Sequence, residues 1–190
     1  MGDSYTYLRL ERASKTTQSQ FTTTITEINE SQVVFDRGLV TDLLGNTVRR
    51  PDGRTFTDNQ NIPLEFDVGR QWVTRYRVST PEGGSSSAEV VYRVLAREPI
   101  TVPAGTFNAF YVEGVGVNTS PRGLMEVQFS TWWDPQRVRR PIAREEIRRL
   151  WRDGDPSASR RPRRPQRGDV RGGGRVLMSE RQELVSFQQS

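Results

Sequence analysis

The chain has no cysteine and no histidine, and these two absences exclude several kinds of chemistry. Zinc sites built from cysteine and histidine cannot form, and neither can a thiol nucleophile. A Ser-His-Asp triad is excluded because no imidazole is available as the general base. Carboxylates, tyrosines, hydroxyl groups and the single lysine, Lys15, remain as candidate catalytic groups, and the sequence predicts no cofactor and no metal ion.

Long apolar runs are also missing. No run of about 18 apolar residues occurs, so the sequence predicts no transmembrane segment. Apolar residues make up 33% of the 190 residues, which is a low fraction for a globular chain. Such a thin core fits a sheet with one apolar face better than a three-layer α/β fold. The length suits a single domain over residues 1–190.

Short alternating segments separated by turn residues run through most of the chain. Trp72–Thr80 alternates apolar and charged side chains, and Ala88–Arg97 does the same. Turn residues stand between such segments, as in Arg50–Gly53 and Pro81–Ser87. About ten segments of this kind predict an all-β fold, an antiparallel meander that forms a half-barrel or a barrel.

Residues 141–151 fit two kinds of element. Pro141 at a first helical position, Glu145 and Glu146 early and arginines late favour one short helix. A strand would divide the same apolar residues between both faces of a sheet. The local pattern favours the helix, whereas the family resemblance described below favours the strand, and we predict a strand.

Residues 152–175 carry the whole positive surplus of the chain. They hold eight arginines and three aspartates, which accounts for the net charge of +5. Rich in proline and glycine, this insertion cannot bury enough apolar area to order itself, so we predict a long, disordered hairpin loop. The favoured interpretation is a tolerated charged insertion. The alternative is a polyanion-binding arm acting through Arg160, Arg161, Arg163 and Arg164. Nucleic acid is the weaker candidate partner, because no aromatic residue interleaves these arginines.

A set of aromatic residues forms the candidate ligand-binding site: Trp72, Tyr76, Tyr92, Phe129, Trp132 and Trp133. On a curved sheet these side chains could line an apolar cavity of the kind that barrel mouths hold. A packed core is the favoured interpretation for any single one of them, because aromatic side chains bury large areas anywhere. Trp132 and Trp133 are neighbours, so on a strand they face opposite sides.

Acidic residues give little support for an enzyme. A glycoside hydrolase would need two carboxylates about 5–9.5 Å apart. Glu113 and Glu126, on predicted neighbouring strands, are the nearest candidates. Glu145 and Glu146 would point apart on a strand, and flanking arginines favour ion pairs for them. The sequence therefore predicts a protein without enzymatic activity.

Four motifs, in order along the chain, resemble those of one bacterial family. Pro63–Trp72 is similar to its "P-L…G-x-x-W" opening, Glu98–Phe107 to its "E-x-V-x-V-P-A-G-T-F" corner, Thr131–Pro135 to its "Y-W-Y-x-P" element, and Gln182–Phe187 to its closing "E-L-V-x-Y" strand. Thr131 and Trp133 depart from the third motif. Over residues 60–190 the chain thus resembles the TapB-like family of bacterial secreted or periplasmic proteins.

This resemblance implies an antiparallel β-rich barrel or half-barrel, a periplasmic or secreted location after removal of a signal peptide, and no catalytic residues. Met1–Asp3 leads directly into a strand-like segment, which leaves a cytoplasmic location open. The predicted function is that of a non-enzymatic envelope protein. It would bind an apolar or amphipathic ligand, or a protein partner, through its concave face. Polyanion binding by the arginine-rich loop is the alternative.

Overall fold

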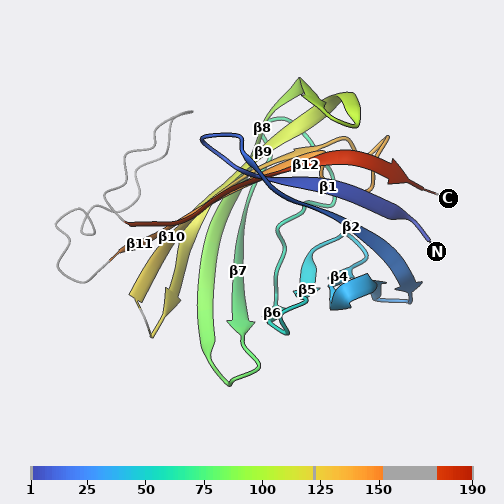
Figure 1. Cartoon of the computed structure of the whole chain (residues 1–190). Helices are drawn as coiled ribbons and strands as arrows, with labels where there is room; N and C mark the ends of the chain where they lie inside the picture. The colour runs from blue at the N-terminus through green and yellow to red at the C-terminus, as the bar shows by residue number, and fades with distance from the viewer. Residues whose placement is uncertain (1, 122, 152–174, 190) are drawn as a thin grey trace.

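The computed structural model describes residues 2–121, 123–151 and 175–189. Within these ranges, twelve antiparallel strands close into one barrel in the order β1-β12-β11-β10-β9-β8-β7-β6-β5-β4-β3-β2 (Figure 1). Each strand pairs with its neighbours in sequence, and the pairing of β1 with β12 closes the ring. The predicted all-β antiparallel meander is therefore confirmed, in its closed form.

The strands differ greatly in length. Their bounds are β1 Ser4–Glu11, β2 Thr17–Ile28, β3 Gln32–Phe35, β4 Val40–Asp42, β5 Thr47–Arg49, β6 Thr55–Thr57, β7 Gln71–Ser79, β8 Ser85–Val102, β9 Gly105–Ser120, β10 Gly123–Trp133, β11 Ala143–Trp151 and β12 Arg175–Gln188. β8 and β9 are the longest, and the Pro-Ala-Gly motif is the turn of their hairpin. The short strands β3 to β6 complete the other side of the barrel.

Residues 143–151 form strand β11, so the strand prediction for this segment is confirmed. β11 pairs with β10 on one side and with β12 on the other. Two ladders of backbone hydrogen bonds outweigh the helix-favouring signals at Pro141 and the early glutamates. The helical structure in the described part of the chain is the short 3-10 turn η1, Asp36–Gly38. Nowhere in the described ranges is there a helix with the length and apolar character needed to cross a membrane.

An apolar core covers the inner face of β7, β8, β9 and β10. Its buried members include Tyr76, Val90, Tyr92, Val94, Val112, Val127, Phe129 and Trp133. Two glycines of β9 allow close packing here. A Cβ atom on Gly114 would lie 2.3 Å from the Tyr92 ring, and one on Gly116 would lie 2.0 Å from the backbone oxygen of Glu89. The Gly-Val-Gly sequence of β9 thus serves packing of β8 against β9.

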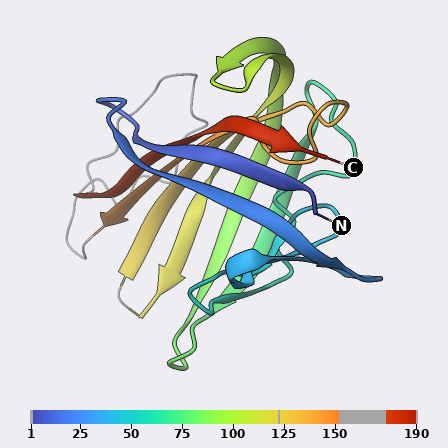
Figure 2. The ribbon, with the colours of Figure 1, turned by 45° about the vertical axis from the view of Figure 1, so that its right-hand side comes forward.

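A second core lies near the chain termini, where the β8–β9 hairpin and residues 134–142 meet β1 and β12 (Figure 2). The Ala104 amide donates a hydrogen bond to the Leu184 carbonyl oxygen at 3.0 Å. Tyr7 donates from its hydroxyl to the Pro141 carbonyl oxygen at 2.9 Å. Phe107 is buried in this cluster with Leu184. The hairpin and the 134–142 segment are therefore anchored to the strands that carry the chain ends.

Candidate ligand site inside the barrel

The register of β10 and β11 shows which side chains face the barrel interior. Residues directly opposite each other on paired strands share a face. Phe129, a member of the inner core, is opposite Glu146, and Val127 is opposite Arg148. Arg144, two residues before Glu146, shares the same face because side chains alternate along a strand. Two arginines and a glutamate of β11 therefore project into the barrel beside the aromatic core.

Five of the six predicted aromatic residues lie on this inner side. The ring of Trp72 stacks on that of Tyr92 with centroids 5.3 Å apart, and Tyr92 stacks on Phe129 at 6.3 Å. Tyr76 and Trp133 belong to the same buried cluster. The structure thus brings these five together as a continuous aromatic wall formed by β7, β8 and β10.

Trp132 lies on the opposite, outer face of β10. Its ring stacks on Tyr111 with centroids 4.9 Å apart, and the Arg181 guanidinium lies 5.2 Å from its centroid. Its indole N–H donates to a carboxylate oxygen of Glu98 at 3.2 Å. The alternation of adjacent tryptophans is as predicted, and it separates Trp132 from the other five aromatic residues.

A cavity of about 80 Å³ lies against the aromatic wall. Tyr92, Phe129 and Trp133 form its apolar side. Its polar side includes Asn46, Asn61, Arg140 and Arg144. A single buried water needs roughly 10–15 Å³, so the cavity has room for several waters or for one small polar group. Sites for drug-sized ligands usually measure about 300–1,000 Å³, so a larger molecule requires its walls to move.

Two loops cover this cavity: residues 43–46, between β4 and β5, and residues 58–70, between β6 and β7. The Ile62 amide of the second loop donates to Asn46 Oδ1 of the first at 2.8 Å. Farther along, the Phe66 ring packs against Phe110 and Trp133, with centroids 5.6 and 5.7 Å away. The 58–70 segment therefore connects the first loop to the aromatic wall.

Glu146 is the carboxylate at the centre of the inner charged cluster. It accepts a hydrogen bond from Arg144 at 2.9 Å and another from Arg148. Burial alone would raise the pKa of Glu146, but the positive charges of Arg144, Arg148 and Arg50 outweigh burial and lower it. Glu146 is therefore ionised and bridges two arginines on its own strand.

Two further arginines reach this interior from loops. The Arg50 guanidinium lies 5.1 Å from the centroid of the Phe56 ring, and that of Arg140 lies 4.8 Å from the centroid of Phe35. Burial lowers the pKa of both, and the positive charge of Arg144 lowers it further. The buried Arg140 Nε has no hydrogen-bond partner among the described residues. The sequence pattern does not reveal this cluster, because its members alternate with outward charges or lie in loops.

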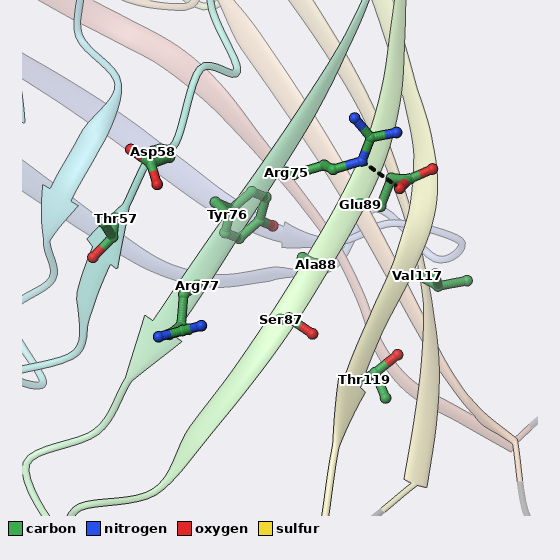
Figure 3. Close-up of a pocket in the computed structure, with 10 residues that line it drawn as sticks. All are labelled: Thr57, Asp58, Arg75, Tyr76, Arg77, Ser87, Ala88, Glu89, Val117 and Thr119. Carbon is green, nitrogen blue, oxygen red and sulfur yellow. Dashed lines mark hydrogen bonds and ion pairs between the residues drawn. The ribbon is translucent and has the colours of Figure 1, made fainter.

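A larger, open hollow of about 660 Å³ runs along β7, β8 and β9, with Thr57 and Asp58 at its β6 side (Figure 3). Arg75 and Glu89 form an ion pair across neighbouring strands with 2.7 Å between nitrogen and oxygen (Figure 3). Both side chains are exposed. The Arg75–Glu89 pair of this hollow is thus neutralised in solvent, in contrast to the charges inside the barrel.

The two acidic residues considered for hydrolysis, Glu113 and Glu126, are not opposite each other on the paired strands β9 and β10. Glu113 is opposite Ser130 and Glu126 is opposite Val117, so the two lie four residues apart in register. Four residues correspond to about 13 Å along the strands. Burial raises the pKa of Glu113 in spite of Arg93, while Glu126 lies 3.8 Å from Arg149. This register therefore gives no support for the closely spaced carboxylate pair that glycoside hydrolysis requires.

The predicted anion-binding residues Arg160, Arg161, Arg163 and Arg164 lie outside the described residues, as does the rest of 152–174. The strands on either side of this segment, β11 and β12, pair directly and antiparallel, as expected for the two sides of a hairpin. Polyanion binding by the insertion stays a prediction.

Three solved structures share the fold. A protein described as exported, with a YmcC-like fold, from Bacteroides fragilis matches with a TM-score of 0.58 and 12% identity over 99% of this chain and 96% of its own. A protein described as a lipoprotein from Parabacteroides distasonis matches with a TM-score of 0.56 and 14% identity over 98% and 95%. The hypothetical lipoprotein YmcC from Escherichia coli matches with 0.53 and 12% over 100% and 86%.

These similarities extend over the whole barrel, and at such low identity they establish the fold alone. No protein-family model matches the chain, and no curated protein matches it in sequence. The resemblance to the TapB-like family therefore stays a prediction, whereas the YmcC-like barrel is supported by three structures.

Proposed function

We propose that this protein is a non-enzymatic carrier or sensor that binds an apolar or amphipathic ligand inside its barrel. The observation that carries the proposal is the cavity between the aromatic wall and the two cover loops. Tyr92, Phe129 and Trp133 offer apolar contact on one side, and asparagine and arginine side chains offer polar contact on the other. Apolar walls together with converging polar groups are typical of small-molecule sites.

The cover loops themselves favour an apolar or amphipathic ligand. Leu43 and Leu44 of the first loop are 57% and 44% exposed, and Leu64 and Val68 of the second are 76% and 58% exposed. A hydrogen bond between Asn46 and Ile62 joins the two loops that cover the cavity. These four aliphatic side chains therefore lie on the outside of its cover. A ligand with an apolar part would meet compatible side chains as the loops open.

The cell envelope is the proposed location. The three proteins that share the fold are described as exported or as lipoproteins. A chain without cysteine needs no disulfide chemistry in an oxidising compartment, so its composition is compatible with such a location. Expression of the natural gene followed by cell fractionation would test this part of the proposal, and recovery of the protein only in the cytoplasm would refute it.

A single introduced cysteine tests the ligand site, since the natural chain has none. In the variant Ile62→Cys the thiol would line the cavity, whereas in Leu64→Cys it would lie on the exposed side of the same loop. Dodecanol, a neutral amphiphile, should slow thiol labelling at position 62 in a saturable manner and leave position 64 unaffected. Equal labelling rates with and without dodecanol at both positions would refute binding inside the barrel.

Polyanion binding through residues 152–174 is a separate proposal that the described residues neither favour nor oppose. Deleting residues 155–173 should abolish retention on heparin and leave the melting temperature nearly unchanged if it holds. Binding should also weaken steeply with salt. Unchanged retention after the deletion would remove this alternative.

A further inference from the structure

Three arginines, Arg144, Arg148 and Arg50, act on one carboxylate inside the barrel, that of Glu146. Arg144 and Arg148 both bind Glu146, while Arg50 and Arg140 contribute two more positive charges to the same interior. Burying a charge without a counter-charge is costly, and proteins usually pair such groups. The cluster as it stands therefore has a surplus of positive charge.

Arg140 and Arg144 are the two members of this cluster that line the cavity. Arg140 comes from the 134–142 segment and its Nη1 lies beside Gly45 of the first cover loop. Arg144 comes from β11, and its guanidinium lies 5.3 Å from the Phe129 ring centroid. Each guanidinium is thus held against an aromatic ring, that of Arg140 against Phe35 and that of Arg144 against Phe129, which restricts its orientation.

Unpartnered polar atoms point to the same place. Arg140 Nε, a donor, is buried without a hydrogen-bond partner among the described residues. Asn61 Oδ1, whose side chain also lines the cavity, is likewise unpartnered, but it is an acceptor and would take its hydrogen bond from a water or from a protonated ligand group. A buried donor without a partner costs free energy unless a ligand or an ordered water satisfies it. Arginine forks match the geometry of carboxylate and phosphate oxygens, with two parallel hydrogen bonds to one group.

We infer that the cavity binds an anionic group, a phosphate or a carboxylate, between Arg140 and Arg144. The inference rests on the proposed function and specifies its ligand: an amphiphile whose anionic head lies at the two arginines and whose apolar part lies along Phe129 and Trp133. Glu146 accepts hydrogen bonds from both Arg144 and Arg148, so one carboxylate serves two guanidinium groups and leaves positive charge for a ligand anion. The cavity of about 80 Å³ has room for the head group alone. Binding of the apolar part along Phe129 and Trp133 therefore requires the cavity walls to move.

Calorimetric titration of the full-length protein with three probes would test this inference: dodecyl phosphate below its micelle concentration, dodecanol and inorganic phosphate. Dodecyl phosphate should bind at least ten times more tightly than dodecanol. Inorganic phosphate should compete with dodecyl phosphate for the site. Equal affinities for dodecyl phosphate and dodecanol would overturn the inference and leave the proposed function standing. Binding of inorganic phosphate without any binding of dodecanol would support the anion site with a free anion as its source, and would refute the amphiphile.

Three variants test whether the preference for dodecyl phosphate over dodecanol depends on Arg140 and Arg144. Arg144→Gln keeps Glu146 paired with Arg148, and Arg140→Lys keeps the charge but removes the planar fork, so both should fold. Each should reduce the preference for dodecyl phosphate about tenfold while dodecanol binding stays the same. Arg75→Gln is the matched control on the outer face, where the arginine pairs with Glu89. Equal loss in all three variants, or no loss in the first two, would overturn the assignment.

Discussion

Glu145 and Glu146 are adjacent in sequence, yet their carboxylates lie on opposite faces of the barrel wall. Glu145 lies outside, where it accepts hydrogen bonds from Arg12 at 2.6 Å and from Arg181 at 2.7 Å. Glu146 lies inside with Arg144 and Arg148. The strand period of two thus places two ion-pair networks back to back. One network lies on the outer face of the wall, and the other belongs to the proposed site.

The inner network should matter more for stability than a surface ion pair. We expect Glu146→Gln to lower the free energy of unfolding by about 3 kcal/mol, because it leaves Arg144 and Arg148 without their shared carboxylate. Glu89→Gln should cost less than about 1 kcal/mol, since the Glu89–Arg75 pair is exposed. Urea unfolding at neutral pH measures both. Similar losses for the two variants would contradict the burial of the inner network.

Acid should weaken the barrel through the same carboxylates. The pKa values of Glu145 and Glu146 are lowered in the folded state from the ordinary value of 4.5, because the arginines around them outweigh burial. A lowered pKa contributes stability above the unfolded value, and this stability is lost as pH falls through the folded one. Stability should therefore decline below about pH 4.5, and Glu146→Gln should show a shallower decline than the natural chain. Parallel curves for the two proteins would contradict this explanation.

Gly116 should be among the least replaceable residues of the chain. An added Cβ atom would lie 2.0 Å from the Glu89 backbone oxygen and 2.6 Å from the Val90 Cα atom, so β8 and β9 would have to separate. We expect Gly116→Ala to cost about 4 kcal/mol or more, a large part of the stability of an ordinary domain. Gly84→Ala, in the exposed β7–β8 turn beside the Thr80 hydroxyl, should cost about 1 kcal/mol or less. Thermal unfolding by circular dichroism would compare them.

Substitutions of the two adjacent tryptophans should have different effects, one on ligand affinity and the other on stability. Trp133→Leu removes an aromatic side chain that lines the cavity, so dodecanol affinity should fall at least tenfold. Trp132→Leu removes the outer stack on Tyr111 and should lower stability without changing that affinity. Titration of both variants, after their folding is verified by circular dichroism, would measure this. Equal affinities of the two variants for dodecanol would place the ligand away from the inner face.

The local sequence pattern was sufficient to predict most of the barrel, because apolar and polar residues alternate in the long strands. In Trp72–Thr80 the alternation identifies the residues that face inward, and the turn at Pro103 and Ala104 marks the β8–β9 hairpin. β11 was harder, because its inner face holds Arg144, Glu146 and Arg148 and therefore does not look apolar. Only pairing with Phe129 and Val127 shows which face points into the barrel, and pairing depends on residues far away in sequence.

The arginine cluster could not be predicted from sequence for the same reason. Arg50 follows the short strand β5, and Arg140 lies in the irregular 134–142 segment, so neither has a periodic pattern that assigns it to a face. The sequence around Arg50 and Arg140 does not distinguish them from the rest of the 27 arginines, because only tertiary packing buries them. The aromatic wall was easier to foresee, since Tyr92, Phe129 and Trp133 occupy inner positions of clearly alternating strands.

A crystal structure grown with 10-bromodecyl phosphate would test the central claim most directly. The anomalous signal of bromine would mark the apolar end of the ligand, and the phosphate density would mark its head. We expect the phosphate between Arg140 and Arg144 and the chain along Phe129 and Trp133, with the loops 43–46 and 58–70 displaced. Ligand bound only on the outer hollow at Arg75, or no bound ligand at saturating concentration, would contradict a binding site inside the barrel.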